Sequence, residues 1–289
     1  MIYKPCKTIA EICCNHKGDM IIAKELIKLA KDCGADVAKF QKRNSKELLP
    51  KEQYNAPHPN PINSYGKTYG EHREFLEFSK EEHKSLMNYC KEIGIEYSTS
   101  VWDVTSAKEV AELNPSLIKV PSASNTHYEM LQVLRDDYKG DVHVSFGMTT
   151  KSEQEKLVSF FEEKGQAKNR LIIYSCTSGY PVPFEDVCLL EILKIKNQFS
   201  DRVKDIAFSG HHLGISIDIA DYILGASWIE RHFTKDRTWK GTDHSASLEP
   251  AGFSKLTRDL KATYKTLSYK EKEILDIEKP QRDKLKFSK

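Results

Sequence analysis

The chain has 289 residues, of which 39% are hydrophobic and 30% are charged. This balance is typical of a folded, soluble protein and excludes an intrinsically disordered chain. Lysine and arginine (44) almost balance aspartate and glutamate (42), which excludes a protein that holds nucleic acid through its overall positive charge.

Hydrophobic and cysteine patterns predict a cytoplasmic protein. No stretch of about 18 apolar residues suggests a membrane span, and the first residues lack the apolar run of a secretory signal. The seven cysteines are odd in number and scattered, which favours reduced thiols in the cytoplasm. We interpret Cys13 and Cys176 as small apolar packing residues, since neither has an evident catalytic histidine.

Short apolar runs alternate with amphipathic stretches along the chain. The apolar runs predict eight strands, at residues 8–14, 36–41, 96–101, 117–122, 142–147, 171–177, 206–210 and 228–233. The periodicity of the amphipathic stretches predicts helices at residues 20–33, 80–93, 106–113, 127–135, 152–164, 184–199, 215–224 and 253–267.

Eight strand–helix units predict an α/β fold with a parallel sheet and helices outside it. The count matches a (β/α)8 barrel, and a doubly wound open sheet is the alternative. No GxGxxG follows the first strand and no P-loop is present, so we prefer the barrel. We place the barrel at residues 1–267 and a basic helical extension at residues 268–289, and we interpret the lysine excess of that extension as solvated helix surface.

One long segment, residues 43–78, interrupts the alternation and is rich in Pro, Asn, His and Tyr. Connections this long inside a compact domain are usually binding loops or lids. We therefore expect this segment to lie over a ligand site.

Polar residues gather where the predicted strands end. The active site of a (β/α)8 barrel lies at the carboxyl ends of its strands. The candidates there are Glu11, Lys39, Gln41, Thr99, Lys119, Ser122, Ser145, Ser178, Tyr180, Ser209, His211, His232 and Asp243. Lys39 and Lys119 lie among apolar neighbours, where burying an ammonium group is costly without an anion. Two lysines, several hydroxyls and loop amides suit a phosphate or a carboxylate. The alternative is that both lysines form buried ion pairs with Glu11 or Glu230 and do no chemistry.

His211 and His232 end neighbouring strands. Two imidazoles placed in this way, with Asp243 nearby, can bind one divalent metal and leave positions open for water and substrate. The alternative is that each histidine is a hydrogen-bonded core or rim residue. Spacing alone does not decide between these two interpretations.

The chain resembles the sialic acid synthase (N-acetylneuraminate synthase) family over residues 7–265. The matching stretches are AEICCNHKGD, GADVAKFQ, YGEHREFLEFS, IKVPSAS, SFGMTT, CTSGYPVPFEDV, FSGHHLGIS and GASWIERHFTKDRTWKGTDHSASLEP. The resemblance implies a (β/α)8 barrel that condenses phosphoenolpyruvate (PEP) with an N-acetylmannosamine-type aldose. The implied products are a nine-carbon 2-keto-3-deoxy sugar acid and phosphate.

The resemblance also implies roles for single residues. It implies that His211 and His232 bind a divalent metal, Mn²⁺ before Mg²⁺ or Co²⁺. It implies that the PEP carboxylate and phosphate are held by Lys39, Thr99, Lys119, Ser122, Ser145 and Ser209. The residues that it places around the sugar are Glu11, Gln41, Ser178, Tyr180 and Asp243. We assign Glu11, Lys39, Lys119 and Asp243 to catalysis, with Glu11 as the proton-transfer group.

The chain departs from the family pattern at three points. Ser178 stands where many members have asparagine, and Ser124 where members often have an acidic residue. We expect only the barrel, without the antifreeze-like domain that follows it in most bacterial members, and a homodimer. Two alternatives follow: a PEP-dependent synthase acting on a different aldose, with Lys42, Arg43 and Arg73 as candidates for a second phosphate, or a non-catalytic sugar-binding barrel.

Overall fold

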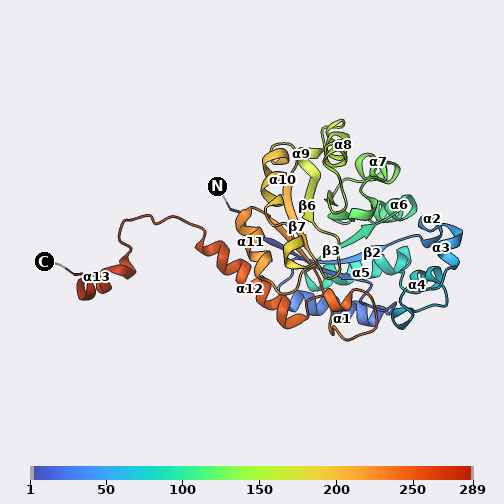
Figure 1. Cartoon of the computed structure of the whole chain (residues 1–289), viewed down its shortest axis with the longest axis horizontal. Helices are drawn as coiled ribbons and strands as arrows, with labels where there is room; N and C mark the ends of the chain where they lie inside the picture. The colour runs from blue at the N-terminus through green and yellow to red at the C-terminus, as the bar shows by residue number, and fades with distance from the viewer. Residues whose placement is uncertain (1–2, 288–289) are drawn as a thin grey trace.

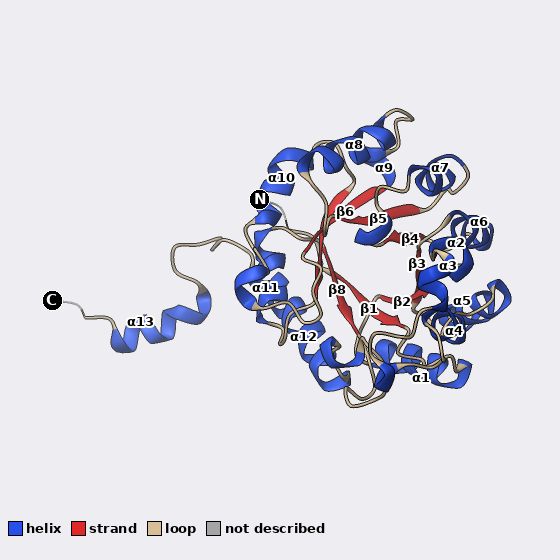
Figure 2. Ribbon diagram, turned by 45° about the vertical axis from the view of Figure 1, so that its right-hand side comes forward, coloured by secondary structure: helices blue, strands red, loops and turns tan. Residues whose placement is uncertain are grey.

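The computed structural model describes residues 3–287, and within them eight parallel strands close into one barrel in sequence order (Figures 1 and 2). The predicted barrel is therefore confirmed, and the open sheet is excluded. The strands are β1 (Lys7–Cys13), β2 (Val37–Lys42), β3 (Glu96–Val101), β4 (Leu117–Val120), β5 (Asp141–Ser145), β6 (Leu171–Cys176), β7 (Asp205–Gly210) and β8 (Trp228–His232).

Helices surround the barrel on the outside (Figure 2). Those in the ring are α1 (Met20–Asp32), α5 (Lys80–Ile93), α6 (Val104–Leu113), α7 (Tyr128–Asp136), α8 (Lys151–Glu162), α10 (Glu191–Phe199), α11 (Ser216–Leu224) and α12 (Pro250–Thr266). The shorter helices are α2 (Ser45–Leu48), α3 (Lys51–Asn55), α4 (Tyr69–Phe75), α9 (Ala167–Arg170) and α13 (Lys279–Leu285).

Helix ends follow local signals in the sequence. Ser79 and Glu82 form a capping box at the start of α5, and Gly94 ends the helix in the left-handed conformation at φ 75°. The helix predicted at residues 80–93 therefore agrees with the structure at both ends. The prediction of one helix over residues 184–199 was wrong in its first half, because Phe184–Asp186 forms a 3₁₀ turn and α10 begins at Glu191.

The long segment at residues 43–78 is more structured than expected. It holds α2, α3 and α4, and Asn44, at the start of the segment, caps α2 through its side chain. The periodicity of a four- to seven-residue helix is too short to recognise in a sequence.

The interior of the barrel has two layers of opposite character. Its lower layer is an apolar cluster made of Ile9, Val37, Leu117, Ile172, Tyr174 and Ala207. Two residues further along four of these strands are Glu11, Lys39, Lys119 and Ser209. Because strand side chains alternate with a period of two, these polar groups lie on the same inner face, one layer nearer the carboxyl ends. The barrel thus supports a charged layer on an apolar floor.

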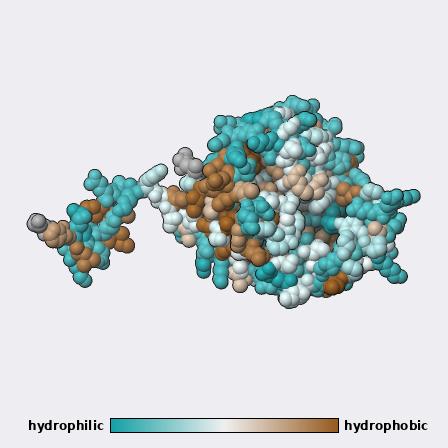
Figure 3. All heavy atoms as spheres, viewed as in Figure 1, coloured by the Kyte–Doolittle hydropathy of each residue, from teal (hydrophilic) through white to brown (hydrophobic). Residues whose placement is uncertain are grey.

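Residues 268–287 leave the barrel after α12 and include α13, which lies apart from it (Figure 1). Tyr269, Ile277, Leu285 and Phe287 in this tail are exposed. Figure 3 shows hydrophobic surface on the tail and on the flank of the barrel from which it departs. In the described part of the chain, no helix combines the length and apolar character needed to cross a membrane.

Candidate active site

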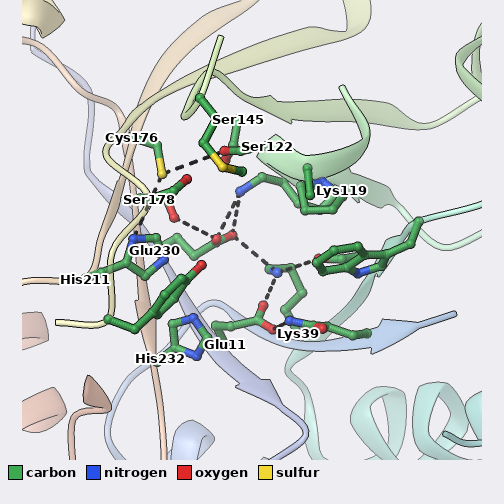
Figure 4. A pocket seen from close by; sticks show the side chains of 18 residues that line it. Glu11, Lys39, Lys119, Ser122, Ser145, Cys176, Ser178, His211, Glu230 and His232 are labelled. Carbon is green, nitrogen blue, oxygen red and sulfur yellow. Dashed lines mark hydrogen bonds and ion pairs between the residues drawn. The ribbon is translucent and has the colours of Figure 1, made fainter. Parts of the chain in front are cut away.

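A cavity of about 310 Å³ opens at the carboxyl ends of the strands (Figure 4). Most of the candidate residues line it together, although they come from seven different strands and the loops that follow them. These are Glu11, Lys39, Gln41, Lys119, Ser122, Ser145, Ser178, Tyr180, Ser209, His211 and His232.

Lys39 lies at the centre of the charged layer. Its Nζ forms an ion pair with Glu11, donates to Ser100 Oγ at 2.8 Å, and lies 3.6 Å from Glu230 Oε2. Gln41 Nε2 donates to the other oxygen of Glu11 at 3.3 Å. Glu11 is thereby held between a cation and an amide, at the edge of the cavity.

Lys119 is paired with Glu230 on the opposite side of the barrel. Its Nζ lies 3.0 Å from each carboxylate oxygen of Glu230 and 3.7 Å from the centre of the Tyr174 ring. Ser209 Oγ donates to Glu230 Oε1 at 3.0 Å. The three polar contacts are buried above the apolar cluster, and Lys119, Ser209 and Glu230 also line the cavity.

Burial and neighbouring charges shift the pKa values of this layer. Burial, reinforced by Lys119 and opposed by Glu230, lowers the pKa of Lys39 to about 7. Burial alone would raise the pKa of Glu230, but Lys119 and Lys39 hold it well below its usual value. Glu230 therefore stays ionised, while Lys39 changes charge near neutral pH.

Hydroxyl groups converge around Gly147, in the loop after β5. A Cβ atom at this position would lie 2.5 Å from Ser178 Oγ and 2.6 Å from Ser122 Oγ. Only glycine leaves both hydroxyls room to face the cavity here. Together with Ser145 they form a neutral, donor-rich wall beside Lys119 (Figure 4).

His211 follows β7 and His232 ends β8, with their ring centres 5.4 Å apart. His211 Nδ1 lies 3.1 Å from the carbonyl of Thr177, to which it donates, so Nε2 keeps its lone pair. Burial lowers the pKa of His211 to about 3 and also lowers that of His232. Both rings are neutral at physiological pH, as metal ligation requires.

The turn after His211 is fixed by a buried arginine. Arg231 Nη2 donates to the His212 carbonyl at 2.5 Å, and its Nη1 donates to Asp218 Oδ2 at 2.5 Å. Arg231 and His232 are consecutive on β8. This strand therefore positions His232 directly and the turn after His211 through Arg231.

Two of the candidate residues lie outside the cavity lining. Thr99 is fully buried, and Ser100 beside it meets Lys39 instead, because adjacent strand residues point to opposite faces. Asp243 lies in the loop after β8, where its Oδ2 accepts from Cys13 Sγ at 2.8 Å.

Cys13, His232 and Asp243 each place a ligand atom within 4.8 Å of the others. Neutral imidazole, carboxylate and the thiolate that a thiol forms on losing its proton are all metal ligands, so this donor set fits a divalent ion. The interpretation of Cys13 as an apolar packing residue does not account for its contact with a carboxylate. A lone thiol in an apolar stretch carries no spacing signal, and only the fold brings it to Asp243.

The sequence prediction also underestimated the number of contacts that Glu230 makes in the site. It entered only as an ion-pair partner for a lysine, yet it contacts Lys39, Lys119 and Ser209. The signal was present in the sequence: Glu230 precedes His232 by two residues on one strand, so both face the cavity.

Known proteins resemble this chain in sequence and in structure. The model of the NeuB family matches residues 26–272. N-acetylneuraminate-9-phosphate synthase of Homo sapiens is 37% identical over 97% of this chain and 76% of its own length. N,N'-diacetyllegionaminic acid synthase of Campylobacter jejuni is 31% identical over 90% of this chain and 76% of its own length.

Among solved structures, the N-acetylneuraminic acid synthetase of Leptospira borgpetersenii superposes with a TM-score of 0.81 and 28% identity. That likeness covers 98% of this chain and 93% of the synthetase. The family model spans most of the barrel, and the human relative is similar over almost the whole chain. The chain therefore belongs to the NeuB family.

Proposed function

We propose that this chain condenses PEP with an N-acetylmannosamine-type aldose, giving a nine-carbon 2-keto-3-deoxy sugar acid and phosphate. The observation that carries the proposal is the charged layer under the cavity, where Lys39 and Lys119 face two neutral histidines and a wall of hydroxyls. Membership of a family of named synthases makes the chain a carbon–carbon bond-forming enzyme that joins PEP to a sugar.

The PEP anion would bind between the two lysines and the hydroxyl wall. Lys39 and Lys119 supply two ammonium groups, and Ser122 and Ser145 supply donors for carboxylate and phosphate oxygens. Ser178, which the family resemblance places near the sugar, lies beside the same glycine as Ser122 and joins this set. Glu11 and Glu230 neutralise the lysines in the free enzyme, so the buried cations are satisfied before substrate arrives. A buried anion site of this kind stabilises negative charge without reorganising during the reaction.

His211 and His232 would hold a divalent metal, with the aldose on the cavity side. The metal supplies a Lewis acid that polarises the aldehyde oxygen of the open-chain sugar. Mn²⁺ is the ion implied by the family resemblance, with Mg²⁺ and Co²⁺ as alternatives. Tyr180, whose ring centre lies 4.5 Å from that of His211, shields this side of the cavity.

The chemistry would then proceed in three steps. The methylene carbon of PEP attacks the aldehyde carbon, and positive charge develops at C2 of PEP. Water adds to C2, and Glu11, fixed by Lys39 and Gln41, takes the proton of the water and passes it to the oxygen of the former aldehyde. The tetrahedral product loses phosphate by cleavage of its C–O bond, and Lys39 and Lys119 stabilise the leaving anion.

A phosphorylated aldose is the second candidate substrate. Identity is higher to the human 9-phosphate synthase (37%) than to the legionaminic acid synthase (31%). A product phosphate at C9 derives from C6 of the aldose, because PEP contributes only the first three carbons. Of the basic candidates, Lys42 is paired with Glu109 and Arg43 with Glu77, whereas Arg73 contacts the hydroxyl of Tyr69. Arg43 and Arg73 line a smaller cavity that shares Trp102 and Ala123 with the main one.

Cytoplasmic location and a homodimer complete the proposal. The exposed apolar side chains of the tail, Tyr269 and Ile277 among them, offer surface that a second subunit could cover. Sedimentation of the full chain tests the dimer directly.

The testing experiment is phosphate release from PEP in the presence of Mn²⁺. The aldoses are N-acetylmannosamine, its 6-phosphate, mannose, mannose 6-phosphate and 2,4-diacetamido-6-deoxy sugars. Release that depends on one aldose, with a keto acid of matching mass, supports the synthase and identifies its substrate. Strict dependence on a 6-phosphate replaces the first candidate by the second. Metal binding without release from any aldose contradicts both candidates.

A further inference from the structure

The thiol of Cys13 lies among metal-ligand atoms rather than in the apolar core. Its Sγ is 2.8 Å from Asp243 Oδ2, and a ring nitrogen of His232 lies within 4.8 Å of both atoms. The three side chains come from the end of β1, the end of β8 and the loop after β8. Bonds of about 2.0–2.3 Å from one ion would place such ligand atoms at comparable separations.

His232 gives an independent indication of a ligand. His232 is 7% exposed, and its Nδ1 is buried without a hydrogen-bond partner in the described part of the chain. An unpartnered polar atom in a buried position costs free energy unless something else binds it. A metal ion that lies beside Cys13 and Asp243 and binds His232 through Nδ1 would satisfy that nitrogen.

Hydrogen bonds between the loops after β1 and β8 hold the thiol of Cys13 close to the carboxylate of Asp243. Asn15 Nδ2 donates to the carbonyl of Phe233 at 2.9 Å and to Ser247 Oγ at 3.0 Å, joining the loops after β1 and β8. Ser247 Oγ in turn donates to the backbone carbonyl of Asp243 at 2.7 Å. Cys13 itself has φ 53°, after a register shift between Glu11 and Cys13. The contact is therefore set by the fold and not by free side-chain rotation.

We propose that Cys13 is a thiolate ligand of the divalent metal, bound together with His232 and Asp243. In the metal-free protein the thiol donates its hydrogen to Asp243. When the ion binds, the metal–sulfur bond forms, the thiol proton leaves to solvent, and no electron is transferred. Thiolate and carboxylate then neutralise the two positive charges of the ion, with a neutral imidazole as the third ligand.

A thiolate changes which ions the site prefers. Sulfur ligands favour Zn²⁺, Co²⁺ and Cd²⁺ over Mn²⁺ and Mg²⁺, which prefer oxygen and nitrogen. The inference rests on the proposed function only in placing a metal beside His232. It adds a ligand that the pair His211 and His232 does not include.

The test is a titration of metal-free protein with Co²⁺, followed by absorption. The wild-type protein and Cys188→Ser, which removes an exposed thiol, should show a sulfur-to-cobalt charge-transfer band, and Cys13→Ser should lack it. In competition assays Cys13→Ser should lose on the order of 100-fold in affinity for Cd²⁺, but only a few-fold for Mn²⁺.

Three outcomes would overturn the inference. The first is a sulfur-to-cobalt band that survives in Cys13→Ser. The second is wild-type protein that binds Co²⁺ without showing the band. The third is an equal loss of Cd²⁺ and Mn²⁺ affinity in Cys13→Ser. Wild-type protein that binds no divalent ion would overturn the metal of the proposed function as well. Thermal denaturation checks that Cys13→Ser folds. Cys13→Gly, which suits φ 53°, serves as the second variant and should also lack the band.

Discussion

The ammonium group of Lys119 lies 3.0 Å from both carboxylate oxygens of Glu230, with both side chains almost completely buried inside the barrel. Lys39 approaches the same carboxylate at 3.6 Å, so one anion is shared by two cations. Glu230 is thus the residue that makes a charged layer with two buried lysines stable in the free enzyme.

Replacing Glu230 by glutamine should destabilise the protein by about 3 kcal/mol, because two buried ammonium groups lose their shared counter-ion. Urea denaturation at pH 7 measures the change. Lys119→Met on the Glu230→Gln background should recover part of the loss, since Lys119 is the ammonium group left without a carboxylate, whereas Lys39 keeps Glu11. Additive losses in the double variant would contradict a direct coupling between the two residues.

The catalytic efficiency with PEP should fall as the pH rises through about 7, where Lys39 loses its charge. The pKa of Lys39 is lowered from 10.5, chiefly by burial, so the ammonium form is present below this pH and lost above it. Lys39→Arg keeps a positive charge at all these pH values and should move the alkaline limb to higher pH, whatever its effect on rate. The measurement is kcat/KM against pH for both proteins. An unchanged alkaline limb in Lys39→Arg would assign that limb to another group.

Gly147→Ala should raise the KM for PEP at least tenfold. The new Cβ would lie within 2.6 Å of the hydroxyl oxygens of Ser122 and Ser178, and both must then move out of the wall. Gly252→Ala is the matched control, because its Cβ meets Leu248 only at an ordinary 3.4 Å, within α12. Steady-state kinetics on the two variants separate the local effect from any general effect of added methyl groups. Equal KM values for Gly147→Ala and wild-type protein would rule out the hydroxyl wall as a PEP contact.

Asp221→Asn should stabilise the protein increasingly as the pH rises from about 4 to about 8. Burial, with Asp218 nearby, raises the pKa of Asp221 from 3.8 to about 8, and both of its carboxylate oxygens are buried without a described hydrogen-bond partner. Over that interval the unfolded chain has released the proton and the folded chain still holds it, so stability falls with rising pH.

For one proton, the free energy of unfolding falls by at most about 1.4 kcal/mol per pH unit. Asparagine does not titrate, so the variant loses this contribution to the pH dependence. Denaturation curves at several pH values give the difference between the two proteins. A difference that does not change with pH would show that Asp221 is ionised in the folded protein.

Much of the fold could be predicted from the sequence because its signals are local. The helix ends at Gly94 and Gly225 and the apolar strand runs each depend on a few neighbouring residues. The residues at the strand ends could also be predicted, since the barrel topology brings all carboxyl ends to one face.

The features of the site that could not be predicted depend on which face of a strand a side chain lies on, or on contacts between residues far apart in the sequence. Thr99 and Ser100 are adjacent hydroxyl residues, and nothing in their types shows which one faces Lys39. The contact between Cys13 and Asp243 depends on a backbone irregularity in β1 and on a loop 230 residues away. No local pattern encodes such a contact.

The long sequence separation between Cys13 and Asp243 also has a consequence for how the barrel folds. Among the strands of the barrel, β1 is synthesised first and β8 last, and the two pair directly, from Lys7 against Trp228 to Glu11 against His232. The Cys13–Asp243 contact can form only after this final pairing, which is among the slowest kinds of folding event because the loop to be closed is so long. A thiol that becomes protected from alkylation during refolding would therefore time the closure of the barrel itself.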